Sequence, residues 1–254
     1  MFIMIKPLKL LESTNLKFGQ LGEYKVLKNC PLSDSNGERI VLDTQYILDE
    51  HGRRCISADV FDAAGVKRAY NTFEINTKTK EFNGLWMKVP NSCDRKKHGY
   101  GEVLRLNSIV TLLENNLKKI TIFSMNDAIP FHHKYKFHPV VSGRDEELEI
   151  LNEISYEKNP LLVKQKSQSI KMMDEILISG MFPSLKASKS NVSEFLDDYL
   201  SEIEKNKIEW FSGKHIRKVN LGVHLNMELD RDTILKNRDF FNRLFEKHKF
   251  DYKI

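Results

Sequence analysis

The stretch that decides the fold reads Leu85-Trp86-Met87-Lys88-Val89-Pro90 and, after a short spacer, Arg95-Lys96-Lys97-His98-Gly99-Tyr100-Gly101. Its first part has the composition of a strand, and its second part is basic and contains two glycines. Apolar residues then recur from Gly101 to Asn115 with the spacing of an amphipathic helix. Because a further short apolar strand follows at 119–124, the pattern predicts a βαβ unit with parallel pairing.

The segments around this unit extend the prediction in both directions. Upstream, strand patterns separated by turn signals predict an antiparallel meander. Downstream, the sequence is mainly helical in character after Pro139, with one alternating strand pattern near the end. The predicted strands lie at 38–48, 55–61, 69–76, 82–89 and 218–227, with a possible first strand at 24–29. The predicted helices lie at 101–115, 128–135, 146–157, 168–178, around 195–203 and from Asp230 onward.

Composition excludes several classes of protein. The 254 residues carry 40 basic and 35 acidic side chains, a net charge of +5, and neither half has a polybasic arm. We therefore expect no nucleic-acid partner. No apolar run reaches the roughly 18 to 20 residues of a membrane span, and no secretory signal is evident. Three scattered cysteines predict neither a disulfide framework nor a zinc ribbon, which favours a reducing, cytoplasmic location.

The basic glycine loop has a chemical interpretation of its own. Glycine lets the backbone approach a ligand closely, and the N–H groups of the first helical turn point outward at the positive end of the helix dipole. Lys96 and Lys97 add positive charge nearby. This combination is suited to a pyrophosphate, although a basic surface turn before a helix is the alternative.

The sequence Lys96-x-x-Gly99-x-Gly101 resembles the Arg/Gln-x-x-Gly-x-Gly/Ala loop of the GCN5-related N-acetyltransferase (GNAT) superfamily, which binds the pyrophosphate of acetyl-coenzyme A. A second family pattern, Ala-Ile-x-Phe-Tyr-x-x-x-Gly-Phe, is similar to residues 128–137. The resemblance spans residues 82–139 well, the preceding strands loosely and the last hundred residues not at all. It implies contacts of acetyl-coenzyme A with Met87, Val89, Lys96, Lys97, His98, Gly99, Tyr100, Gly101 and Asn126.

The same resemblance suggests catalytic residues. The family's usual tyrosine, often the acid that protonates the coenzyme A thiolate, falls at His132, and an imidazolium is a competent proton donor. The alternative is a polar residue on an exposed helix face. Glu81 is the nearest glutamate for a general base, with a solvated strand-end residue as its alternative. The family's glycine falls at Lys136, which predicts an altered helix exit.

Two further departures concern the acceptor and metals. The family usually has two helices between its first two strands, and here they are predicted to be shortened or absent. Acceptor recognition would then fall to the C-terminal helices. Neighbouring histidines His132, His133 and His138 lack the spacing of a helical metal site, so we predict no metal.

The prediction is thus a mixed α+β fold, a GNAT-like and mostly antiparallel sheet with flanking helices and a helical C-terminal extension. Residues 1–140 would form the acyl-coenzyme A-binding core and 141–254 the extension, with a final strand at 218–228 joining the core sheet. The function implied is transfer of acetyl from acetyl-coenzyme A to an amine by direct attack. The alternative is a weak or inactive GNAT-like module that acts through protein contacts.

Overall fold

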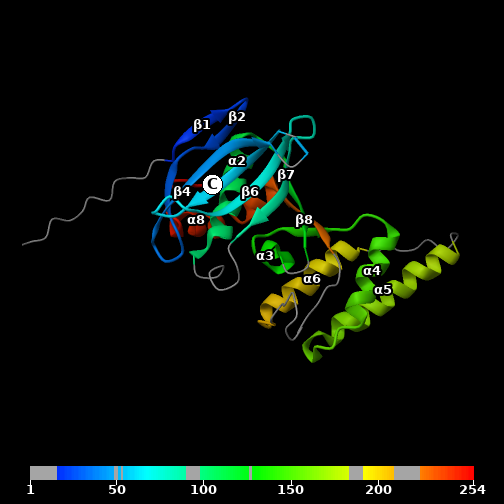
Figure 1. The fold of residues 1–254 in the computed structure, drawn as a ribbon. Helices are drawn as coiled ribbons and strands as arrows, with labels where there is room; N and C mark the ends of the chain where they lie inside the picture. The colour runs from blue at the N-terminus through cyan, green and yellow to red at the C-terminus, as the bar shows by residue number, and fades with distance from the viewer. Residues whose placement is uncertain are drawn as a thin grey trace, which may run out of the picture. The chain divides into compact units, whose positions relative to one another are not determined.

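The computed structural model describes residues 16–48, 51–52, 54–89, 98–125, 128–182, 191–208 and 224–254 (Figure 1). The chain divides into two compact units, neither of which is one continuous stretch of sequence. Unit 1 comprises 1–73, 86–116 and 235–254, and unit 2 comprises 74–85 and 117–234. The predicted division at residue 140 stays a prediction.

The fold is a mixed α+β structure, as predicted. Eight strands follow the order β3-β4-β5-β6-β7-β8-β10-β9, and a separate hairpin pairs β1 (Phe18–Leu21) with β2 (Tyr24–Leu27). All recorded pairings in the larger sheet are antiparallel except that of β7 with β8. The sequence pattern had missed the short strands β1, β3 and β9.

Unit 1 contains the predicted meander. β3 (Cys30–Ser33), β4 (Arg39–Leu48), β5 (Arg54–Phe61) and β6 (Lys67–Asn76) follow one another in the sheet, and β6 crosses into unit 2 at its end. The turn between β3 and β4 comprises residues 34–38, which confirms that the family's two helices are absent at this point. Buried aliphatic side chains alternate along β4, as a strand with one covered face requires.

Helix α2 (Tyr100–Glu114) is the central helix of unit 1. It packs against β2, β5 and α8 (Arg238–Lys247), and its first thirteen residues are all buried. One polar residue within it, Ser108, has a partner in the interior: the Asn71 side-chain amide of β6 donates to the Ser108 hydroxyl across 3.2 Å. A helix covered on all sides is held by tertiary packing more than by its own amphipathicity.

Unit 2 contains the parallel pair. Residues 81–84 of β7 (Glu81–Lys88) pair in parallel with 119–122 of β8 (Lys119–Ser124). The recorded pairing ends at Gly84 with Ile122, although β7 continues to Lys88. On its other side β8 pairs with β10 (Leu225–Asp230), which in turn pairs with β9 (His138–Val140).

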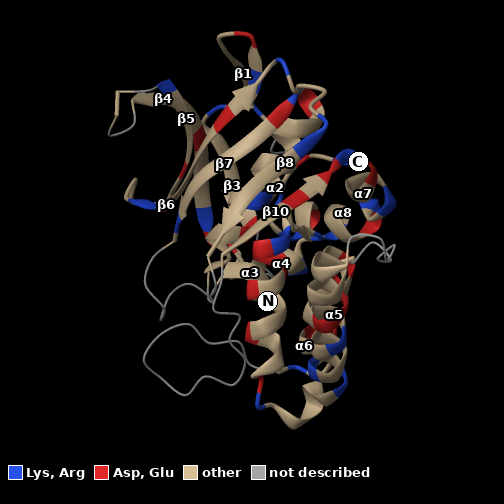
Figure 2. Cartoon of the chain, turned by 90° about the vertical axis from the view of Figure 1, so that its right-hand side faces the viewer, with Lys and Arg blue, Asp and Glu red and all other residues tan. Residues whose placement is uncertain are grey.

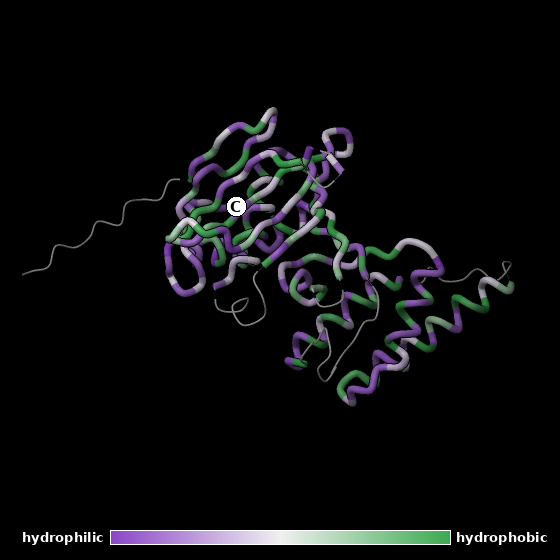
Figure 3. The backbone as a smooth tube through the Cα atoms, viewed as in Figure 1, coloured by the Kyte–Doolittle hydropathy of each residue, from purple (hydrophilic) through white to green (hydrophobic). Residues whose placement is uncertain are grey.

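The helices of unit 2 pack mainly on each other. α4 (Arg144–Ser155) lies against α5 (Val163–Met181) after a short 3-10 turn η2 (Pro160–Leu162), and α3 (Ile129–Lys134) contacts α6 (Val192–Lys205). Polar and apolar residues alternate along α4 and α5, as Figure 3 shows. Both signs of charge occur on α5 (Figure 2).

The end of the chain differs from the prediction in two respects. The last strand begins at Leu225 rather than 218, with residues 209–223 outside the described part. The single helix predicted from Asp230 is two helices, α7 (Arg231–Lys236) and α8, which are separated at Asn237. Of the helices in the described ranges, none has the length and hydropathy that a membrane span requires.

Candidate functional site

The start of α2 has a distinct backbone conformation. Gly99 precedes the helix with φ 67°, ψ 21°, in the left-handed region that glycine adopts without strain. The first helical hydrogen bond runs from the Val103 N–H to the Gly99 carbonyl, 3.1 Å. The N–H groups of Tyr100 and Gly101 therefore precede the hydrogen-bond ladder of the helix, which is the arrangement that an anion site at a helix N-terminus needs.

The β3–β4 turn packs directly on this helix start. The Ser35 N–H donates to the His98 carbonyl across 2.9 Å, and a Cβ at position 99 would collide with the Ser35 hydroxyl. Gly99 is thus required by two independent features, its left-handed conformation and its contact with the turn. The second feature had no signal in the sequence, since Ser35 and Gly99 are 64 positions apart.

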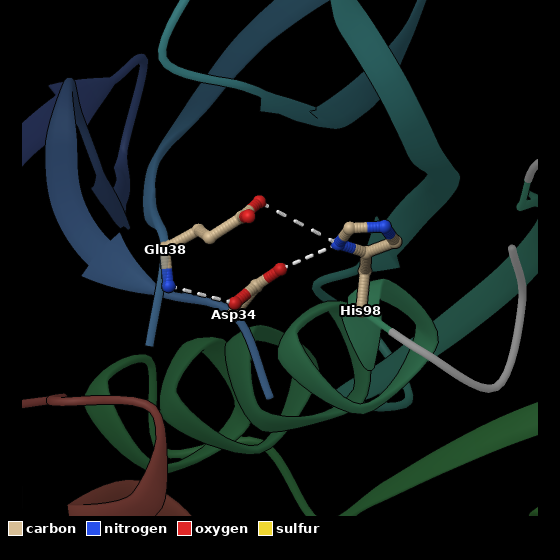
Figure 4. Close-up of side chains that lie close together, drawn as sticks. All are labelled: Asp34, Glu38 and His98. Atoms are coloured by element: carbon tan, nitrogen blue, oxygen red, sulfur yellow. Dashed lines mark hydrogen bonds and ion pairs between the residues drawn. The ribbon is translucent and has the colours of Figure 1, made fainter. Parts of the chain in front are cut away.

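The same turn holds the His98 side chain. Nδ1 of His98 lies 2.6 Å from Oδ2 of Asp34 and 3.9 Å from Oε2 of Glu38, as the close-up in Figure 4 shows. Oδ1 of Asp34 accepts the backbone N–H groups of Asn36 and Glu38, at 2.8 and 2.9 Å. Because a carboxylate only accepts, Nδ1 carries the hydrogen, and Nε2 is the outer ring nitrogen.

Burial differs sharply within this cluster. The Asp34 side chain is fully buried, His98 is 23% exposed and Glu38 is 69% exposed. The three ligand-type atoms lie within 4.8 Å of one another. The 2.6 Å separation of Nδ1 and Oδ2 is that of a direct hydrogen bond. Within the described residues the cluster is therefore a hydrogen-bonded pair with an exposed carboxylate beside it.

Tyr100 lies next to this pair. Its ring stacks on the His98 imidazole, with centroids 5.1 Å apart and planes within 10°. Burial raises the pKa of the Tyr100 hydroxyl above its ordinary value, and the nearby Asp34 carboxylate adds to this effect. Tyr100 is thus kept in its neutral form at the start of the helix.

At the end of β7 in unit 1, two neighbouring side chains have different surroundings. Trp86 is 68% exposed, whereas the Met87 sulfur lies 3.9 Å from Nη2 of Arg105, a buried residue of α2. Val89 follows the strand and is partly exposed.

Three of the predicted coenzyme contacts lie outside the described residues. These are Lys96, Lys97 and Asn126, and the neighbouring Arg95 and Cys93 lie outside them as well. Met87, Val89, His98, Gly99, Tyr100 and Gly101 are described, and all of them belong to unit 1.

His132, the proposed acid, lies on α3 in unit 2. Its side chain is only 6% exposed, so the alternative of an exposed helix face is wrong. Its ring contacts Phe131 edge-on at 5.1 Å and Phe137 at 5.7 Å. His132 is therefore a buried imidazole in an aromatic environment.

Glu81, the proposed base, opens β7. Its carboxylate accepts from the Thr79 hydroxyl across 2.9 Å and lies 3.6 Å from Nζ of Lys119, which also pairs with Glu228 at 2.7 Å. The neighbouring carboxylate of Glu228 raises the pKa of Lys119. Glu81 is thus a member of an ion-pair network at the start of the strand.

The exit of α3 shows how this chain accommodates its substituted glycine. Lys136 has φ 68°, the left-handed conformation, and the next residue, Phe137, is buried. The predicted alteration of the helix exit stays a prediction; the lysine itself adopts a backbone conformation that glycine favours. A side chain in this region costs roughly 1 to 2 kcal/mol.

No family model matches the chain, and no curated protein does. Solved structures are similar to parts of it. Tetrahymena GCN5 is 15% identical with a TM-score of 0.32, over 39% of this chain and 59% of its own. A spermidine N-acetyltransferase SpeG chimera from Vibrio cholerae and hSSAT is 16% identical with a TM-score of 0.30, over 36% of this chain and 57% of its own. Nourseothricin acetyltransferase is 12% identical with a TM-score of 0.29, over 42% of this chain and 71% of its own. This chain therefore spans less than two thirds of the first two structures.

Proposed function

We propose that this chain is an N-acetyltransferase of the GNAT type that takes acetyl-coenzyme A as donor and an amine as acceptor. The observation that carries the proposal is the start of α2. The Lys96-x-x-Gly99-x-Gly101 sequence coincides there with a left-handed Gly99 and with first-turn N–H groups ahead of the helical ladder. These groups are suited to the pyrophosphate of the coenzyme.

The residues of unit 1 fit this ligand in two further ways. β7 continues beyond Gly84, where its recorded pairing with β8 ends, so its last residues retain backbone groups for the amides of the pantetheine arm. Met87 and Val89 lie on this part of the chain. Lys96 and Lys97 would add charge opposite the phosphates.

The reaction proposed is direct attack of the amine nitrogen on the thioester carbon. The C–N bond forms, the C–S bond breaks, and the thiolate of coenzyme A takes up a proton as the amine loses one. His132 is the proposed proton donor, and Glu81 or the amine's own ionisation accounts for the amine proton. The acceptor is an amine, of a small molecule or of a protein lysine or N-terminus.

A thermal-shift experiment tests binding first. We expect millimolar acetyl-coenzyme A to raise the Tm of the full chain, and we expect Lys96→Ala to reduce that rise. Gly99→Glu is expected to reduce the rise as well. Gly65→Glu, at a solvent-open turn between β5 and β6, is its matched control and should leave the rise unchanged. No rise in the wild type, or equal rises in all variants, contradicts the proposal.

A mass-spectrometric screen then tests transfer. The full chain is incubated with acetyl-coenzyme A and with pools of proteins and small amines, and a gain of 42 Da is expected on an amine. Thermal shift without any acetylated amine would favour a coenzyme-binding module without activity. His132→Gln is expected to lower turnover while it leaves the thermal shift intact, because the acid acts on the leaving group.

A further inference from the structure

The β3–β4 turn reaches the start of α2 through two separate contacts. One joins the Ser35 N–H to the His98 carbonyl, and the other joins the buried Asp34 carboxylate to the His98 ring. The turn replaces the helices that the family resemblance implied between these strands. It is therefore a feature of this chain that the resemblance does not account for.

Asp34 is unusually well fixed for a residue in a five-residue turn. Its Oδ1 is saturated by two backbone N–H groups, so Oδ2 has one orientation and points at Nδ1 of His98. The Tyr100 ring lies flat against the imidazole and limits its rotation. The side chain of His98 is thus held from two sides before any ligand arrives.

We propose that Asp34 is a positioning residue that holds His98 as an imidazolium, with Nδ1–H donated to Asp34 and Nε2–H donated to the coenzyme pyrophosphate. This inference rests on the proposed function. An imidazolium donates through both nitrogens, and it is here placed between a carboxylate and an anionic ligand. The backbone N–H groups at the start of α2 and the Nε2–H of His98 would then donate to the same pyrophosphate.

Charged and neutral groups face His98 from two elements. From the β3–β4 turn, Asp34 and the more distant Glu38 face it, and from α2 the neutral Tyr100 stacks on it. A bound pyrophosphate adds two further negative charges, so the proposal predicts that its binding is accompanied by uptake of a proton.

Three variants separate the two bonds that His98 makes. Asp34→Asn keeps the acceptor for the turn N–H groups but removes the carboxylate oxygen opposite Nδ1. His98→Asn places an amide N–H near the position of Nδ1–H and has no equivalent of Nε2. Glu38→Gln is the matched control, since its carboxylate is exposed and 3.9 Å from Nδ1.

Isothermal titration of the full chain with coenzyme A, 3′-dephospho-coenzyme A and pantetheine is the test. Asp34→Asn and His98→Asn are expected to weaken both pyrophosphate ligands by about tenfold, in the range of one charge-assisted hydrogen bond. Pantetheine affinity should stay unchanged, because pantetheine has no phosphate. Glu38→Gln should change each affinity by less than about twofold.

Calorimetric titration at pH 8 in buffers of different ionisation enthalpy measures the number of protons taken up on binding. A purely structural role of His98 would leave that number unchanged. The wild type is expected to take up protons on binding coenzyme A, and His98→Asn to take up fewer. If the wild type binds but both variants match it, or if pantetheine affinity falls in parallel, the role of Asp34 and His98 is overturned. If the wild type binds no coenzyme A at all, the proposed function itself fails.

Discussion

Nε2 of His248 lies 2.6 Å from Oε1 of Glu102, and both side chains are buried. Nδ1 of the same ring lies 2.8 Å from the Ser33 carbonyl, so one imidazole joins α8 to the first turn of α2 and to the end of β3. The C-terminal helix thereby supports the helix start and the β3–β4 turn at once. Stability of this corner of unit 1 should depend on the pair.

Removal of the Glu102 carboxylate should lower the stability of the folded chain. Glu102→Ala leaves Nε2 of a fully buried His248 without its acceptor, and we expect a loss of about 2–4 kcal/mol in the free energy of unfolding. Lys247, the other partner of Glu102 at 2.6 Å, is 44% exposed. Lys247→Met should cost less than about 1 kcal/mol. Urea denaturation measures both values, and similar losses would show that the buried pair has no special role.

Gly99→Ala should be more damaging than substitution at another left-handed glycine. Gly65 has φ 77° and open space around its Cβ position, so Gly65→Ala costs only backbone strain, about 1 kcal/mol. At Gly99 the added methyl group also meets Ser35 and lies 3.2 Å from Cε1 of His248. We expect at least about 1 kcal/mol more destabilisation, measured by urea unfolding. Equal losses would mean that the turn does not pack on the helix start.

Lys136→Gly should stabilise the chain. It relieves a left-handed lysine, and after the entropy cost of glycine we expect a gain of about 0.5–1 kcal/mol. Lys134→Gly, two residues earlier inside α3, provides the matched control and should destabilise by about 1 kcal/mol. Thermal and urea unfolding of the two variants should therefore move in opposite directions. A Lys136→Gly variant that is less stable than the wild type would show that the left-handed backbone at Lys136 is not strained.

His133 should make the stability of unit 2 depend on pH. Its ring nitrogens lie 2.9 Å from Glu204 and 3.1 Å from Asp197, both on α6. Burial alone would lower the pKa of His133, but the hydrogen bonds that its ring donates to the Asp197 and Glu204 carboxylates outweigh burial and raise the pKa. A raised pKa contributes stability that is fully present below the unfolded value, about 6.5, and is lost as pH rises through the folded value.

The urea midpoint of the wild type should therefore exceed that of His133→Gln most at pH 6 and progressively less toward pH 9. The reciprocal hydrogen bond lowers the pKa of Asp197, so the pair stays intact down to about pH 4. In a chain that also carries Asp197→Asn and Glu204→Gln, the gap between His133 and its Gln variant should no longer shrink toward pH 9, because burial alone lowers the pKa of His133. A constant gap in the wild-type background would rule out this pairing.

Local patterns predicted much of the fold because the responsible interactions are themselves local. Alternation located β4 to β8 within two residues, and helical spacing located α2 within one. Strand β2 lies within the possible strand predicted at 24–29, whereas β1 was missed because it is only four residues long and contains a glycine. The break at Asn237 was missed because apolar spacing continues across it. Asp34 had no signal, since its contact with His98 spans 64 positions of sequence.

The most direct test of the central claim is the amide ¹⁵N–¹H spectrum of the full chain during titration with coenzyme A. We expect the largest shifts at the backbone N–H groups of Gly99, Tyr100 and Gly101, because these would donate to the pyrophosphate. Dephospho-coenzyme A should reproduce those shifts, and pantetheine should not. Saturable binding that leaves these three amides unmoved, or no binding at millimolar concentration, would contradict the account.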